Sequence, residues 1–183
     1  RVEASRNFAN KIWNASRFIM MNMPEEGLQV TDPVLQPVDK WILSKLNALI
    51  KDATENMDHF ELGIAVQKVY DFIWDEFCDW YVEIAKYRIY HAEEDSQSAN
   101  CALWVLKTVL GQALKLLHPF MPFITEEIYG ALVPEEESLM MSSWPVYRED
   151  WEFPYATEVI EHVKAITRGI RNMRAEMNVP NNK

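Results

Sequence analysis

The stretch ELGIAVQKVYDFIWDEFCDWYVEIAKYRIYH, residues 61–91, decides the fold class. Its apolar residues recur at the three- and four-residue steps of an α-helix rather than at the two-residue step of a strand. They are Val66, Val69, Tyr70, Ile73, Phe77, Trp80, Tyr81, Ile84 and Tyr87. This periodicity predicts one helix over the whole stretch, the longest in the chain, with an apolar side.

Other segments have the same spacing and predict further helices. The first ends near residue 23, the second opens near Val38, and the rest cover about 97–118, 125–132 and 155–177. The apolar stripe of the first is Phe8, Ile12, Ala15, Ile19 and Met23, and that of the last is Val159, Val163, Ile166, Ile170, Met173 and Met177. The prolines of HPFMPF (118–123) force a turn, and residues 134–154 are expected to be an irregular surface connection. The prediction is an all-α, antiparallel helix bundle.

Composition sets the class of protein. The 183 residues are 49% hydrophobic and include only 5 Gly, which fits one mainly helical domain with a sizeable core. Cys78 and Cys101 lack metal or disulfide spacing, so they are expected to be buried thiols in a reducing compartment. No apolar run approaches the roughly 20 residues of a membrane span, and a soluble, cytoplasmic protein is predicted. The net charge of −10 excludes a generally basic surface but leaves room for a local basic strip.

Sequence motifs for metal binding and catalysis are missing. Each histidine lacks an acidic residue three positions before it, and Glu158 with His162 is an isolated pair. No Gly-rich phosphate loop, GxSxG or HExxH occurs. Asp71, Asp75 and Asp79 share one helix face and would repel one another unless paired. Ion pairing with Lys68 or with a basic neighbouring helix is the favoured explanation, and a catalytic carboxylate dyad is the alternative.

The first helix is basic in an acidic protein. Within residues 1–23 the only acidic residue is Glu3, and the basic residues are Arg1, Arg6, Lys11 and Arg17. The local charge is therefore +3 (four minus one). At 100° per residue, Arg6, Asn10 and Arg17 lie on one side, while Asn7, Lys11, Asn14 and Phe18 lie on an adjacent side. Arginine binds phosphate, asparagine reads base edges and an exposed Phe stacks on an unpaired base. The alternative is that Phe18 and Trp13 are core residues and that the polar residues pair with the acidic helix.

The last predicted helix has a second basic ridge. Its members are Lys164, Arg168, Arg171 and Arg174, partly offset by Glu161 and Glu176. A solvated helix face is the common explanation for such a ridge. Together with the first helix, however, it makes a focused basic strip a reasonable hypothesis.

Several blocks resemble one protein family. The sequence is similar to the segment that follows the catalytic core in class I aminoacyl-tRNA synthetases, and especially to the valine type. The blocks, in family order, are RNFANKIWNASRF (6–18), DKWILSKLN (39–47), WDEFCDWYVEIAK (74–86), LLHPFMPFITEEIY (116–129), SSWP (142–145) and IRNMRAEMNVP (170–180). The resemblance implies an anticodon-binding helical bundle over residues 1–155. Residues 156–183 would be the last helix and the start of a linker towards a C-terminal coiled-coil arm.

The resemblance also implies a function and its residues. The chain would bind tRNA(Val), with Phe18 stacking on an anticodon base and with Arg17, Asn14, Arg6, Arg1 and Lys11 as nearby contacts. Arg168, Arg171 and Arg174 are candidate contacts to the tRNA backbone. The family's HIGH and KMSKS signatures do not occur here, so no catalytic residue, metal or cofactor is expected in this chain. ATP and Mg²⁺ would belong to the full-length ligase, whose catalytic core would be a partner of this domain in a monomer.

Two other functions remain open. One is the anticodon-binding domain of an isoleucyl or leucyl enzyme. The other is a protein-interaction bundle that uses its acidic surface and the loop SSWPVYREDWEF (142–153). Affinity that falls steeply with salt would distinguish phosphate binding from a hydrophobic docking surface.

Overall fold

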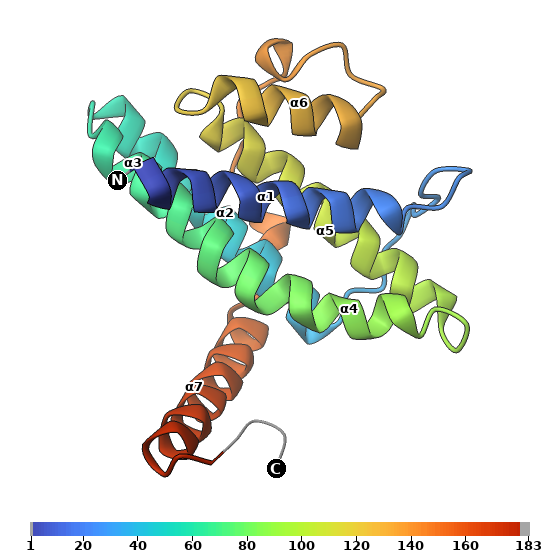
Figure 1. The fold of residues 1–183 in the computed structure, drawn as a ribbon. Coiled ribbons are helices and arrows are strands. Elements are labelled where there is room, and N and C mark those ends of the chain that lie inside the picture. Colours follow the sequence, from blue (N-terminus) through green and yellow to red (C-terminus); the bar gives the residue numbers. More distant parts are fainter. Residues whose placement is uncertain (1, 180–183) are drawn as a thin grey trace.

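The described part of the chain is built from helices. The computed structural model describes residues 2–179, and no strand occurs among them, which confirms the predicted all-α class. The elements in chain order are α1 (Val2–Met21), α2 (Pro37–Asp58), α3 (Leu62–Asp71), the π-helix η1 (Phe72–Val82), α4 (Glu83–Tyr90), α5 (Ser96–Leu117), α6 (Pro122–Leu132), the short 3-10 helices η2 (Leu139–Met141) and η3 (Glu149–Trp151), and α7 (Pro154–Glu176) (Figure 1). Within the described residues, no helix is both long and apolar enough to cross a membrane.

The predicted helix over residues 61–91 is a single rod made of α3, η1 and α4 (Figure 1). Its middle is a π-helix of 11 residues, which the α-helical spacing did not predict. Five of the nine apolar positions are less buried than predicted: Val66, Tyr70 and Trp80 are half-buried, and Ile84 and Tyr87 are exposed. A π-helix has a wider turn, so a stripe drawn with α-helical spacing drifts off the buried side along η1.

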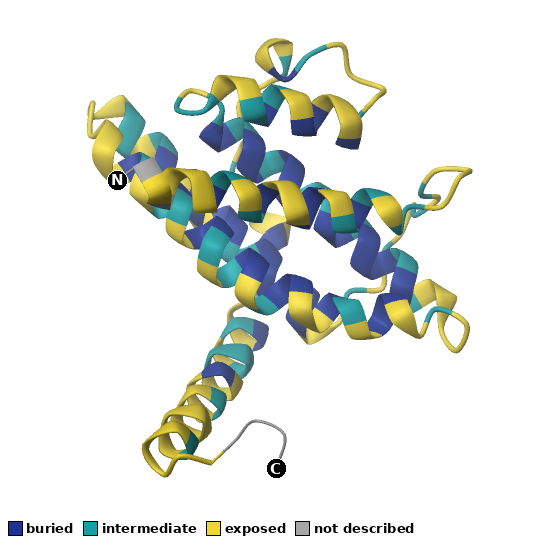
Figure 2. Cartoon of the chain, in the orientation of Figure 1, coloured by how far each residue is buried: buried dark blue, intermediate teal, exposed yellow. Residues whose placement is uncertain are grey.

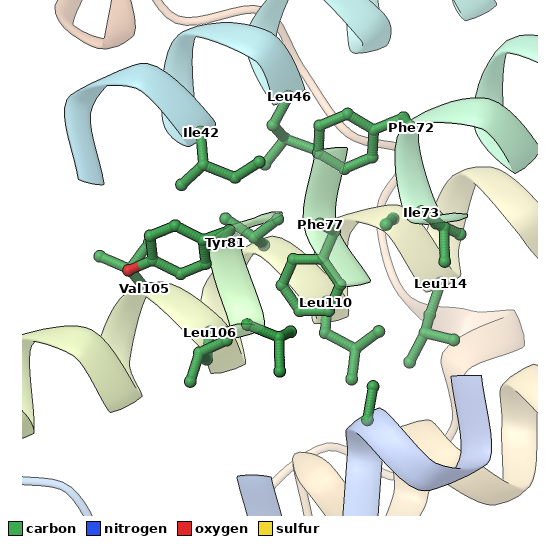
Figure 3. Packing of buried hydrophobic residues seen from close by; sticks show 14 of the residues in the cluster. Ile42, Leu46, Phe72, Ile73, Phe77, Tyr81, Val105, Leu106, Leu110 and Leu114 are labelled. Atoms are coloured by element: carbon green, nitrogen blue, oxygen red, sulfur yellow. The ribbon is translucent and has the colours of Figure 1, made fainter. Parts of the chain in front are cut away.

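The core lies between this rod, α2 and α5. Figure 3 shows Phe77 and Tyr81 of η1 packed among Leu106 and Leu110 of α5 and Ile42 of α2. The predicted stripe of α1 is confirmed, because Phe8, Ile12, Ala15 and Ile19 are all buried in the same cluster. Met23 follows the end of α1 and is half-buried.

Polar side chains inside the bundle join four elements. Asp39 of α2 is fully buried and pairs with Arg88 of α4 at 2.7 Å. The Tyr81 hydroxyl donates to the same carboxylate at 2.7 Å, and the Arg88 guanidinium also donates to Ser98 of α5. Asp39 additionally accepts the backbone N–H of Gln36 and so caps the start of α2. We call these residues the Asp39 network, which ties α2, η1, α4 and α5 together.

The helix α7 differs from the others because little of it is buried. Ala156 and Lys164 are its buried residues, and beyond them the helix runs away from the bundle (Figures 1 and 2). Most of its predicted apolar stripe is therefore exposed, namely Val163, Ile166, Ile170, Met173 and Met177. The periodicity correctly predicts a helix here, but that stripe does not pack against the described bundle.

A charged cluster fixes α7 to the bundle. Lys164 is 1% exposed and bonds to Glu76 of η1 and, at 3.2 Å, to Glu161 of its own helix. Glu161 in turn accepts the indole N–H of Trp41 at 2.9 Å, and Lys45 lies within 3.5 Å of both glutamates. Burial alone would raise the pKa of Glu161, but the Trp41 bond and the two lysines outweigh it and lower that pKa. We call this set the Lys164 cluster.

The connection before α7 is mostly irregular, as predicted. It contains η2 and η3, and its Trp151 is buried. Asn47 holds it to α2, because the amide group donates to the Arg148 carbonyl at 2.7 Å and accepts the Arg148 N–H at 2.8 Å. The predicted domain boundary at residue 155 falls at the start of α7 and stays a prediction.

Candidate nucleic-acid interface

The outward side of α1 carries unpaired polar residues. Arg6, Asn14 and Arg17 are exposed, and no side-chain hydrogen bond or ion pair joins any of them to the described residues. The buried stripe on the opposite side holds the helix down, so these donors point away from the core. Arg1, another candidate, lies outside the described residues.

Phe18 lies at the edge of the core rather than inside it. The side chain is half-buried, and its ring packs edge-on against Tyr90 of α4, with 6.2 Å between ring centroids. The Lys86 ammonium lies 5.7 Å from the Phe18 ring. Trp13, which the alternative interpretation placed in the core, is 40% exposed. Half-burial fixes the ring while leaving part of it open to solvent.

The sequence reasoning missed the aromatic residues at the end of α4, one of which, Tyr90, contacts Phe18. Tyr87 and Tyr90, at the end of α4, are 67% and 66% exposed, although large aromatic rings usually bury much of their surface. The Tyr87 ring lies 4.2 Å from the ring of exposed His91. We call Phe18, Tyr87, Tyr90 and His91 the aromatic patch. The aromatic-rich stretch KYRIYH (86–91) could have indicated the aromatic patch, but helical spacing assigned Tyr87 to the apolar stripe.

Lys11 is engaged within the protein. Its ammonium lies 3.7 Å from the centroid of the Trp74 ring and 2.5 Å from the Asp79 carboxylate. The predicted pairing of the acidic face with a basic neighbouring helix is thus confirmed at Asp79. Lys68 instead pairs with Asp52 of α2 at 2.9 Å, so that part of the prediction was wrong. Lys11 therefore has less freedom to contact an external ligand than Arg17 has.

The predicted basic ridge of α7 is split by burial. Lys164 belongs to the Lys164 cluster and is not a surface cation, which corrects its place in the ridge. Arg168 and Arg171 are exposed and lie 5.8 Å and 5.5 Å from the centroid of the Trp80 ring of η1. Arg174 is half-buried. Two separate cationic surfaces therefore remain, one on α1 and one on α7.

The titratable groups give this surface no evident catalytic centre. No group of three metal-ligating side chains occurs in the described range. Burial raises the pKa of the Cys78 thiol to about 12 and that of Cys101 to about 11, so neither is a thiolate at neutral pH. Both cysteines are buried, as predicted. The arrangement offers stacking faces and hydrogen-bond donors.

Comparisons with known proteins find a matching family and similar proteins. Residues 39–183 match the family described as the anticodon-binding domain of tRNA ligase. The chain is 51% identical over 182 residues to the valine–tRNA ligase of Clostridium perfringens and 48% identical over 185 residues to that of Clostridium acetobutylicum. It is 44% identical over 185 residues to the valine–tRNA ligase of Bacillus anthracis.

These matches cover nearly all of this chain, 98% for the first relative and 100% for the other two. They cover 20% or 21% of each relative, so the chain spans about a fifth of the length of those ligases. The family match takes in α2 to α7, and the relatives' similarity extends it through α1, where the exposed arginines and Phe18 lie. On this evidence the chain belongs to the family of anticodon-binding domains of tRNA ligases.

Proposed function

We propose that this chain is the anticodon-recognition module of a valine–tRNA ligase and that its RNA ligand is tRNA(Val). The proposal rests on the position of Phe18, which is half-buried against the exposed Tyr90 and follows the unpaired Arg17 in sequence. Unstacked loop bases present their faces and their Watson–Crick edges to a protein. The aromatic patch supplies faces for stacking, and Arg17 and Asn14 supply donors for the edges.

The bases to be read follow from the genetic code. Valine anticodons share A at the middle position and C at the third position, so a reader must distinguish both. Stacking on an aromatic ring contributes about 1–3 kcal/mol for each base and depends little on sequence. Hydrogen bonds from Arg17, Asn14 or Arg6 must therefore provide the discrimination. Lys11 contributes chiefly by holding α1 against η1 through Asp79.

The ligase reaction itself belongs, in this proposal, to the remainder of a longer polypeptide. That remainder would contain the catalytic core, which would bind valine, ATP and Mg²⁺ and would contact this domain. This chain would add recognition without chemistry, in a cytoplasmic monomer. The names of the relatives favour valine over an isoleucine or leucine specificity.

The test is binding of the 183-residue chain to two anticodon stem-loops. One carries a valine anticodon, and the other differs only by G in place of the middle A. Fluorescence anisotropy with end-labelled RNA at two salt concentrations gives both Kd values. We expect the single base change to weaken binding at least tenfold, because a donor–acceptor pair at the base edge is then mismatched. Equal affinity for the two loops would contradict base reading by this domain.

Two variants test whether Phe18 stacks on an RNA base. Phe18→Ala should weaken binding to the valine loop about tenfold by removing one stacking face. The matched control is Phe123→Ala on α6, where a ring that is 90% exposed lies outside the aromatic patch. That control should bind normally. A Phe18→Ala protein that binds normally would refute the stacking role, and loss of helicity by circular dichroism would identify Phe18 as a structural residue instead.

A further inference from the structure

We propose that Trp80 is a positioning residue that holds Arg168 and Arg171 as a clamp for one RNA phosphate. This inference rests on the proposed RNA-binding function and adds a site remote from the aromatic patch. Arg168 and Arg171 come from α7, whereas Trp80 comes from η1. The clamp is thus assembled across the junction at which α7 leaves the bundle.

The position of α7 places both arginines over the same ring. Lys164, Arg168 and Arg171 follow one another at steps of four and three residues, so they share one face of the helix. The Lys164 cluster anchors the start of that face to Glu76 of η1. Trp80 lies four residues after Glu76 along η1 and faces the two arginines, at 5.8 Å and 5.5 Å from its ring centroid.

The charge at this junction is not balanced within the protein. In the Lys164 cluster, two lysines face two glutamates, and their charges cancel. Arg168 and Arg171 form no salt bridge with any described residue, although the chain has 28 acidic residues. The nearest acidic neighbour of Trp80 in sequence, Asp79, is occupied by Lys11. Two adjacent cations therefore lack an acidic partner on a protein of net charge −10.

The kind of contact decides what the arginines are free to bind. A salt bridge uses the N–H donors of a guanidinium group, and a ring under its flat face does not. The cation–π contacts with Trp80 therefore hold both guanidinium groups near one ring and leave their donors available. Restrained, unpaired guanidinium groups suit a phosphate, which accepts bidentate hydrogen bonds from arginine. A carboxylate accepts the same bonds, but on an RNA ligand the anionic groups that offer them are the backbone phosphates.

The experiment measures how affinity for tRNA depends on salt. The slope of log K against log salt concentration reports the number of phosphates neutralised, at about 0.7 to 0.9 per contact. We would compare the unmodified chain with the Arg168→Gln/Arg171→Gln variant, using an unmodified tRNA(Val) transcript. We expect the variant to lower the slope by about 1 and to weaken binding roughly tenfold at low salt. An unchanged slope would overturn the clamp.

Trp80 is tested by a double-mutant cycle. Trp80→Leu removes the π face and keeps an apolar side chain, whereas Trp80→Phe keeps a π face. Trp80→Leu should weaken binding about threefold to fivefold in the original chain and not at all in the double-arginine variant, and Trp80→Phe should restore most of the loss. If Trp80→Leu weakens binding equally in both backgrounds, it acts by loosening α7, and the positioning role is wrong.

The results also separate this inference from the proposed function. If Phe18→Ala weakens tRNA binding while the arginine variant keeps the full slope, anticodon recognition stands and the clamp is refuted. If the unmodified chain does not bind the tRNA(Val) transcript, both proposals fail. Thermal unfolding of every variant checks that the compared proteins are folded.

Discussion

Breaking the Asp39 network should destabilise the bundle more than any surface ion pair does. The perturbation is Arg88→Met, which keeps much of the side-chain length and removes the charge. Asp39 is fully buried, and the side chain of Arg88 is 7% exposed. The substitution removes the 2.7 Å bond to Asp39 and two bonds of 2.8 Å to Ser98. It leaves a buried carboxylate with the Tyr81 hydroxyl, the Gln36 N–H and the Cys101 thiol as remaining donors.

The magnitude follows from the burial of both partners. Removing one partner of a buried pair costs about 3–5 kcal/mol, because the other charge stays desolvated without compensation. That is a large part of the roughly 5–15 kcal/mol that stabilises a domain. Tyr81→Phe removes one hydrogen bond to a charged group and should cost about 1.5–3 kcal/mol. The double variant Asp39→Asn/Arg88→Met should cost less than the sum of its single changes, since neither charge is then left alone.

Urea unfolding followed by far-ultraviolet circular dichroism measures these free energies by linear extrapolation. The matched control is Asp52→Asn, because Asp52 pairs with Lys68 at 2.9 Å while both side chains are substantially exposed, at 50% and 39%. Such a pair contributes at most about 1 kcal/mol. An Arg88→Met protein as stable as the Asp52→Asn protein would show that desolvation already offsets the buried pair. A strictly additive double variant would show that Asp39 and Arg88 act independently.

Two other predictions concern the junction of α7 and the buried thiols. Lys164→Met should increase hydrogen exchange in α7 while leaving α5 protected. The expected cost in stability is about 1–3 kcal/mol, because Lys45 still faces Glu76 at 3.5 Å. Equal exchange in the variant and the original chain would mean that apolar contacts alone hold α7. Burial raises the pKa of Cys78 from 9.0 in an unfolded chain to about 12, so its contribution to stability is complete below pH 9.0 and is lost as the pH rises towards 12. Cys78→Ala should therefore lose less stability between these pH values than the original chain, and parallel pH profiles would contradict a buried neutral thiol.

Helical spacing predicted the elements well because most of their apolar residues face a single core. The stripe of α1 is an example, since the residues from Phe8 to Ile19 at helical steps are all buried. The exact start of α6 was missed by three residues, because Pro122 is the first residue of the helix rather than part of the turn before it. The Asp39 network could not be predicted, because its members are brought together from residues up to 62 positions apart.

The site was harder to predict than the fold. A periodic stripe records which residues are apolar, and it does not record whether another surface covers them. For this reason, Tyr87 and the stripe of α7 were both assigned to apolar helix faces, because they are apolar at helical spacing, yet both are exposed. The pairing of Lys11 with Asp79 joins residues 68 positions apart, so charge counting along α1 could not distinguish Lys11 from Arg17.

The π-helix η1 places Trp80 where α7 lies over it. In an α-helix, Phe77, Trp80 and Ile84 would share one face, because they are three and seven residues apart. The buried residues of η1 are instead spaced by five, as in Phe72 to Phe77 to Val82 and in Ile73 to Cys78. The wider turn keeps Phe77 in the core and moves Trp80 to the flank, where α7 lies over it. A run of aromatic residues that α-helical spacing would bury thus provides both core packing, through Phe77, and a platform for two arginines, through Trp80.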